Sequence, residues 1–255
     1  MLKTDAMQPK LFANLFITLL FMLIVVPFSC DAQTEFEKDV FVTSMGDLEI
    51  TFIGHGTLMF SINDKVIHVD PVMREANYEL MPDADLICVT HEHGDHLDKK
   101  AISEVWKENT KLILNQNSFN IIGKGKVLAN GDTWEWEGFP IKAVAAYNVE
   151  NKRPSGEPFH PEGVGNGYVF TFGDVKVYVA GDTENIPEMK SLENIDIAFL
   201  PMNLPYTMTP EMVAKAARLF KPKILYPYHY GKTDPEKLIP LLKDENIEIR
   251  IRNMQ

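Results

Sequence analysis

Short apolar runs rich in β-branched residues alternate with polar turn residues from residue 40 onward. Four such runs follow one another closely, at 40–45, 48–54, 57–62 and 65–70. Gly46-Asp47 and Asn63-Asp64 supply turn residues between neighbouring runs, which predicts an antiparallel meander. The next run, 84–90, is apolar throughout, as expected for a strand that is covered on both faces.

Helical periodicity then alternates with further apolar runs. The segment 98–108 has helical spacing with Asp98 as its N-cap, a second helix is predicted over 209–220, and a last one begins at Asp234-Pro235. Further strands are predicted at 111–115, 140–148, 167–172, 175–182, 195–200, 223–230 and 247–251. This order predicts an α/β (α+β) fold in which two mixed β-sheets pack together and helices lie outside them.

The segment 148–166 interrupts this alternation. It is rich in Pro, Gly and Asn, and it contains a lone histidine, His160. Long loops in compact domains often carry function. We therefore expect this segment to help form a binding site.

Residues 1–32 have the pattern of an export signal. A positively charged start precedes the apolar run 11–28, and small residues follow it, as in secretory signals. Cleavage after Ala32 and lipidation of Cys30 in the manner of a bacterial lipoprotein both stay open, and the run is about long enough to remain as a membrane anchor. We expect an exported protein, periplasmic or lipid-anchored to a membrane, in which residues 33–255 form a single domain.

Composition narrows the classes of partner. The 255 residues carry a net charge of −11, which argues against a nucleic-acid partner because nucleic acids favour a basic surface. After removal of the signal only Cys88 would remain, so no intramolecular disulfide is possible. The charge does not identify the substrate, which we expect to be a small molecule, and the oligomeric state stays open.

Three of the seven histidines lie in one short stretch, THEHGDHLD at 90–98. It follows a predicted buried strand and precedes a predicted helix, where open α/β sheets place ligands. His91 and His93 can converge on one point, Gly94 permits a turn with unusual dihedral angles, and Asp95 and His96 then face a second point. Imidazole and carboxylate ligands suit zinc, iron or manganese. The stretch therefore predicts a metal site rather than a solvated polar turn.

The same stretch resembles the H-x-H-x-D-H motif of the metallo-β-lactamase superfamily. Other stretches resemble that family in the same order along the chain: GHGTLMF, VIHVDP, YVAGDT and YPYHYG. FHPEGVGNGYVF and LPYTM resemble the branch related to bacterial ascorbate-phosphate lactonase and N-acyl phosphatidylethanolamine phospholipase D. The resemblance implies a four-layer αββα sandwich of two mixed sheets with outer helices, and a metal-dependent hydrolase.

The resemblance also implies six ligands for two divalent ions, with zinc expected first and manganese or iron as alternatives: His91, His93, Asp95, His96, Asp182 and His229. Asp182 would bridge both ions, unless it is a helix N-cap instead. The family places a further histidine where this chain has Asn148, so the first site depends on a substitute. We expect His160 from the following loop to complete it; otherwise the first site is weakened and one ion dominates.

Several other residues are candidates for supporting roles. Asp70 is expected to hydrogen-bond a ligand imidazole and fix its tautomer, with a turn before Pro71 as the alternative. His55, Tyr206 and Tyr230 are candidate substrate contacts, and packing is the alternative for each of them.

The reaction implied is hydrolysis by a metal-bound hydroxide. Two ions about 3.5–4 Å apart share a water whose pKa falls to about 7, and Asp95 or Asp182 can accept its proton. No serine or cysteine nucleophile stands out. The expected substrate is a lactone, another acyl compound or a phosphodiester. The alternative is a catalytically weak or inactive metal-binding protein of the same fold, because Asn148 departs from the family pattern.

Overall fold

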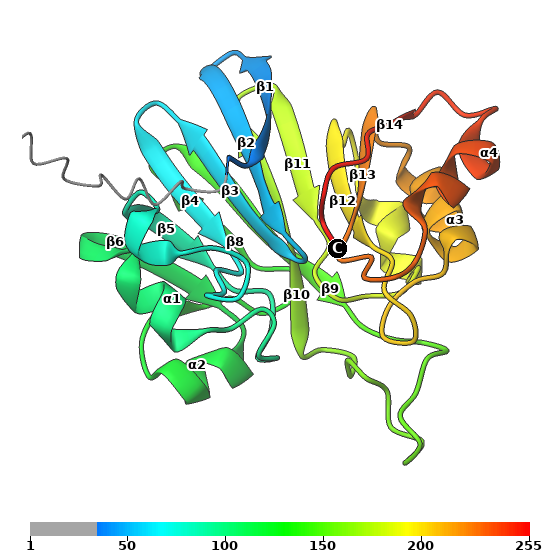
Figure 1. Cartoon of the computed structure of the whole chain (residues 1–255), viewed down its shortest axis with the longest axis horizontal. Coiled ribbons are helices and arrows are strands. Elements are labelled where there is room, and N and C mark those ends of the chain that lie inside the picture. The colour runs from blue at the N-terminus through cyan, green and yellow to red at the C-terminus, as the bar shows by residue number, and fades with distance from the viewer. Residues whose placement is uncertain (1–34) are drawn as a thin grey trace, which may run out of the picture. The chain divides into compact units, whose positions relative to one another are not determined.

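The computed structural model describes residues 35–255, so the predicted export signal and its candidate processing sites, Cys30 and Ala32, lie outside the described residues. Two seven-stranded mixed sheets form the centre of this part of the chain. Helices α1 (Lys99–Glu104) and α2 (Gln116–Ile122) lie outside the first sheet, and α3 (Pro210–Phe220) and α4 (Leu238–Leu242) lie outside the second (Figure 1). The predicted four-layer sandwich is confirmed. Within residues 35–255, no helix has the length and apolar character needed to cross a membrane.

The first sheet contains the strands in chain order: β1 (Glu37–Thr43), β2 (Gly46–Gly54), β3 (Thr57–Ile62), β4 (Lys65–Val69), β5 (Ala84–Cys88), β6 (Trp106–Leu114) and β7 (Lys126–Val127). Strands β1 to β4 pair antiparallel, and pairing is parallel from β4 to β7. Asn63 and Asp64 both have positive φ, 49° and 58°, in the predicted turn between β3 and β4, as tight hairpin turns require.

The second sheet repeats this arrangement, again with its strands in chain order: β8 (Thr133–Trp136), β9 (Phe139–Ala146), β10 (Gly165–Phe172), β11 (Val175–Val179), β12 (Ile197–Pro201), β13 (Ile224–Tyr228) and β14 (Glu248–Ile249). It changes from antiparallel to parallel pairing at β11. Short 3-10 helices cover Tyr78–Leu80, Pro187–Ser191 and Pro235–Lys237. Several parallel strands of both sheets therefore end at one edge of the sandwich, where the histidine-rich segments follow them.

Aromatic side chains fill the space between the sheets. The Phe60 ring lies 5.4 Å from that of Phe170, edge to face, and the Phe52 ring lies 5.0 Å from that of Tyr226. Each pair joins one sheet to the other, and offset or edge-to-face geometry is favourable for aromatic rings. Cys88 is buried as a free thiol in the same core. This core packs the two sheets against each other next to the edge where the parallel strands end.

Sequence patterns misplaced several elements. The predicted helix 98–108 ends at Glu104, and residues from Trp106 belong to β6 because Trp106 pairs with Ala84 of β5. Tertiary pairing overrides the helical propensity of the surface residues that follow. Helix α2 and strands β7 and β8 were not predicted. The α2 sequence QNSFNII lacks a clear apolar period, although Asn115 caps its start and Gly123 its end.

Candidate metal centre

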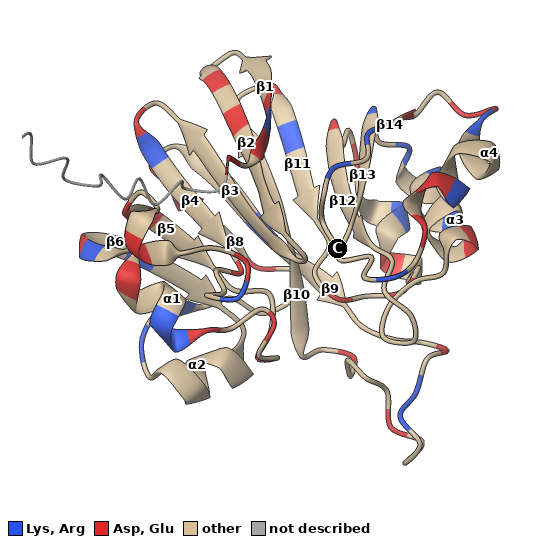
Figure 2. Ribbon diagram, in the orientation of Figure 1, with Lys and Arg blue, Asp and Glu red and all other residues tan. Residues whose placement is uncertain are grey.

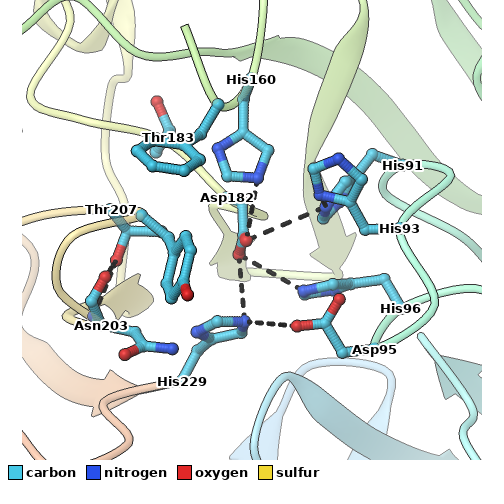
Figure 3. Close-up of polar contacts among 12 residues, drawn as sticks. His91, His93, Asp95, His96, His160, Asp182, Thr183, Asn203, Thr207 and His229 are labelled. Atoms are coloured by element: carbon cyan, nitrogen blue, oxygen red, sulfur yellow. Dashed lines mark hydrogen bonds and ion pairs between the residues drawn. The ribbon is translucent and has the colours of Figure 1, made fainter. Parts of the chain in front are cut away.

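Asp182 lies at the centre of a ring of histidines at the edge where the parallel strands end (Figure 3). Its Oδ2 is 3.2 Å from His160 Nε2 and 3.8 Å from His91 Nε2. Its Oδ1 is 3.4 Å from His96 Nε2 and 3.5 Å from His229 Nε2. The two oxygens of one carboxylate thus face two different pairs of imidazoles, and Asp182 caps no helix of residues 35–255.

A first group of candidate ligand atoms belongs to His91, His93 and His160, which lie within 4.8 Å of one another. His91 Nε2 and His93 Nδ1 are 3.0 Å apart. Two nitrogens bound to one tetrahedral zinc ion at about 2.0–2.1 Å would be about 3.3 Å apart, so the observed spacing fits a shared ion.

A second group lies on the other side of Asp182. Ligand atoms of His55, Asp95 and His229 are within 4.8 Å of one another, and those of His91, His96 and Asp182 form a third such set. Asp95 Oδ2 is 3.3 Å from His55 Nε2 and 3.5 Å from His229 Nε2. His55 was expected to contact substrate; the structure places it among the candidate ligands, with its ring 3.8 Å from that of His229.

Unpaired buried atoms indicate that this ring fits a cation. His96 Nε2, Asp182 Oδ1 and His229 Nε2 are buried and make no hydrogen bond with any residue of the described range 35–255, although buried polar atoms are normally paired. Burial lowers the pKa of His91 well below its ordinary value, and neighbouring His96 adds to that shift. A neutral His91 presents a lone pair at neutral pH. A set of histidines and aspartates without cysteine suits a catalytic divalent ion.

Asp70 and Thr90 orient two of the imidazoles. The buried Asp70 carboxylate accepts hydrogen bonds from Thr90 N and Thr90 Oγ1, both at 2.7 Å, and from His96 Nδ1 at 2.8 Å. Thr90 Oγ1 in turn lies 3.0 Å from His91 Nδ1. With Nδ1 engaged in each ring, Nε2 of His91 and of His96 is directed toward Asp182, as outer hydrogen bonds do for metal ligands. Asp70 therefore has the predicted contact, whereas Thr90 was not predicted.

Glu184 organises the loop that delivers His160. Its fully buried carboxylate accepts hydrogen bonds from the backbone N–H groups of residues 149–151 at 2.6–2.8 Å and from Asn148 Nδ2 at 3.1 Å. Asn148 Oδ1 then accepts from the Nδ1 of His160 at 2.8 Å. Asn148 thus contacts His160, and it is the His160 ring rather than the Asn148 side chain that lies next to Asp182. Nothing in the sequence pattern singled out Glu184, which follows the GDT motif directly.

Two glycines lie near the site, and one of them differs from expectation. A Cβ on Gly56 would lie 2.7 Å from His96 Cε1 and 3.4 Å from His229 Cδ2, so only glycine lets these rings approach. Gly94, expected to need unusual dihedral angles, has no positive φ, and a Cβ there would meet nothing within 4 Å. The turn at residues 90–98 therefore does not depend on its glycine for backbone conformation.

The ring opens into a pocket of about 450 Å³. Asp95, His93 and Tyr206 line it, and Tyr206 is 44% exposed at its rim. Tyr230 does not line the pocket: its buried hydroxyl donates to Arg252 O at 2.8 Å. The substrate role expected for Tyr230 is corrected to a packing role, because its polar atom is already paired with the last residues of the chain.

Comparisons with known proteins agree with this geometry. A family profile described as a beta-lactamase superfamily domain matches residues 49–229. A UPF0173 metal-dependent hydrolase of Thermococcus onnurineus is 30% identical to the chain, over 78% of this chain and 93% of its own length. Another, of Methanopyrus kandleri, is 28% identical, over 80% of this chain and 95% of its own length.

Solved structures are similar as well. A protein of Parabacteroides distasonis described as a metal-dependent hydrolase has 54% identity and a TM-score of 0.84, covering 87% of this chain and 100% of its own. Igni18, a metallo hydrolase of Ignicoccus hospitalis, has a TM-score of 0.67 at 20% identity, covering 82% of this chain and 96% of its own, which shows the shared fold alone. The chain belongs to the beta-lactamase superfamily and is a metal-dependent hydrolase of the metallo-β-lactamase fold.

Proposed function

We propose that the protein hydrolyses a small-molecule ester-type bond, in a lactone, another acyl compound or a phosphodiester, with two divalent ions that we expect to be zinc. The observation that carries this proposal is the position of Asp182. Each of its two oxygens faces a separate pair of histidines at 3.2–3.8 Å. A carboxylate between two groups of imidazoles suits a bridging ligand in a two-ion site.

The bound ions would supply Lewis acidity and a water of lowered pKa. The chain's own residues would hold and orient this centre. His91, His93 and His160 form one candidate group and would bind the first ion. Asp95, His96 and His229 would bind the second; Asp95 Oδ2 lies 3.5 Å from His229 Nε2. Asp70 keeps the Nε2 lone pair of His96 directed inward through its hydrogen bond to Nδ1.

Asp95 is placed to handle a proton in this reaction. Its side chain is 34% exposed and lines the pocket, whereas that of Asp182 is only 4% exposed. Asp95 can therefore accept a proton from the attacking water and return it to the leaving group. Asp182, buried among four histidines, would act as a ligand.

The pocket volume and the N-terminal sequence support the remaining parts of the proposal. About 450 Å³ suits a small molecule, and the net charge of −11 disfavours nucleic acid as a substrate. The signal-like pattern of residues 1–32 supports action outside the cytoplasm, with any membrane attachment made through that segment.

Metal content and hydrolysis test the proposal together. The purified protein, loaded with zinc, manganese or iron, would be assayed on 4-nitrophenyl butyrate, a simple lactone and bis(4-nitrophenyl) phosphate. We expect about two ions per chain and turnover of at least one substrate, with both reduced in Asp182→Ala. Bound metal with no turnover on any substrate would favour the inactive metal-binding alternative, and absence of bound metal would overturn the proposed centre.

A further inference from the structure

Arg153 differs from the other arginines of the chain. The sequence has five arginines, and four of them form ion pairs with carboxylates: Arg74, Arg218, Arg250 and Arg252. No carboxylate of residues 35–255 lies within 4.0 Å of the Arg153 guanidinium. In a chain with a net charge of −11, an unpaired arginine beside a pocket leaves one cation available to a ligand.

The surrounding loop holds Arg153 at the pocket. Its N–H donates to Glu157 O at 2.7 Å, and its O accepts from Gly156 N at 2.9 Å, which closes a tight turn. Its guanidinium donates to Phe159 O at 3.2 Å and lies 5.1 Å from the Phe159 ring centroid. Cation–π contact and this hydrogen bond restrict a side chain that is otherwise exposed.

Phe159 connects this arginine to the metal centre. It directly precedes His160, and its ring packs edge to face with Tyr206 at 5.1 Å. Arg153, Phe159 and Tyr206 line the same pocket as Asp95. Acidic and basic positions are interspersed along the loop between β9 and β10 (Figure 2). The loop as a whole is therefore not strongly basic, and Arg153 stands out because its guanidinium has no carboxylate partner within residues 35–255.

We propose that the substrate carries an anionic group, a carboxylate or a phosphate, that is separate from the bond hydrolysed and is bound by Arg153. A guanidinium presents a planar fork of N–H donors that matches the oxygens of either group. Arg74 also lines the pocket, but its Nε already donates to Glu75 at 2.7 Å. The kinetic test with ester substrates rests on the proposed function, whereas the measurement of anion binding does not require hydrolysis.

Matched esters test the inference by kinetics. For the zinc-loaded protein, we expect kcat/KM for mono-4-nitrophenyl glutarate to exceed that for 4-nitrophenyl butyrate about tenfold, the factor worth about 1.4 kcal/mol. Arg153→Ala should remove most of this ratio through KM, and Arg153→Lys should retain part of it. Arg218→Ala, the same substitution at a paired arginine on α3, should keep the full ratio. An unchanged ratio in Arg153→Ala, or a loss in Arg74→Ala alone, would overturn the assignment.

Equilibrium binding tests the inference without turnover. Calorimetry with glutarate and with glycerol 3-phosphate should give a Kd about tenfold weaker for Arg153→Ala than for the unsubstituted protein. The anion that loses more affinity identifies the group that Arg153 recognises. An unchanged Kd for both anions overturns the inference, whatever the esterase kinetics. If no ester is hydrolysed while the Kd shifts, the proposed function fails and the anion site stands.

Discussion

Asn148 Oδ1 accepts two hydrogen bonds from His160, one from its backbone N–H at 2.7 Å and one from its ring Nδ1–H at 2.8 Å. The first bond shows that this atom is the amide oxygen, because a backbone N–H needs an acceptor. The proton of His160 is therefore on Nδ1. This leaves Nε2 as the ring nitrogen for a cation, and it lies 3.2 Å from Asp182 Oδ2.

Asn148→Ala should weaken metal binding without removing a ligand. Loss of the orienting amide frees the His160 ring, and outer hydrogen bonds of this kind contribute about 10- to 100-fold to metal affinity. Competition with a fluorescent chelator would measure the change. Asn120→Ala, at an exposed asparagine of α2, is the control and should bind metal normally. Equal affinity in both variants would remove the orienting role of Asn148.

Asp182→Asn should lower both metal content and hydrolysis. The amide keeps the shape of the side chain but lacks the negative charge that two cations would share. We expect kcat/KM to fall at least about 100-fold and bound metal, measured by plasma emission, to fall by half or more. Asp174→Asn, in the exposed turn between β10 and β11, should change neither quantity. Full metal content and activity in Asp182→Asn would contradict a bridging role.

Glu184→Ala should destabilise the protein. The substitution leaves the Asn148 amide and three backbone N–H groups without their acceptor, and an unsatisfied buried group costs about 1–3 kcal/mol. Water can enter the space of the deleted side chain and accept some of these hydrogen bonds, so the total loss is smaller than the sum over the four groups. We expect the free energy of unfolding in urea to fall by about 3 kcal/mol. Glu188→Ala removes an exposed carboxylate that accepts from Tyr147, and it should cost less than about 1 kcal/mol. Equal losses of unfolding free energy in the two variants would show that the buried hydrogen bonds of Glu184 stabilise the protein no more than the exposed one of Glu188.

Gly56→Ala should disturb the metal centre, whereas Gly94→Ala should not. A Cβ 2.7 Å from His96 Cε1 forces the ring to move, because carbon atoms pack at about 3.5–4.0 Å. Metal affinity should therefore drop about tenfold or more in Gly56→Ala. Gly94 has open space around it, so metal content should be retained there. The reverse result would mean that the turn, rather than the β2–β3 connection, sets the ring positions.

Stability should decrease in acid through Asp39. Burial raises the pKa of Asp39, but hydrogen bonds from Arg252 and Tyr226 outweigh this effect and lower it below its ordinary value. A depressed pKa in the folded state stabilises the protein above the unfolded value of about 3.9. That contribution is lost as the pH falls through the lower folded value.

Denaturation in urea at several pH values would measure this contribution. Asp39→Asn should lower the free energy of unfolding by about 1 kcal/mol at pH 7, because it removes a carboxylate that joins β1 to Arg252 and Tyr226. The difference between the two proteins should shrink below a pH of about 4. A difference that is constant with pH would show that ionisation of Asp39 does not contribute.

Sequence reasoning succeeded where one side chain or one short motif carries the information. The spacing of His91, His93, Asp95 and His96 indicated a metal site, and alternating apolar runs predicted the two sheets. It failed at Tyr230, whose hydroxyl pairs with Arg252 O, and at the end of helix α1, where pairing with β5 decides the backbone. In these cases the partner is distant along the chain, so no local pattern reports it.

The amino-acid sequence by itself determined that the histidine-rich stretch can bind a cation and where most of the strands lie, because both follow from side-chain chemistry and local periodicity. Only the tertiary structure decided that Asp182 faces two separate groups of histidines, that Asn148 and Glu184 hold His160 in place, and that Arg153 has no carboxylate partner among residues 35–255. These relations join residues tens of positions apart. They depend on how the strand ends meet at one edge of the sandwich, which local sequence does not encode.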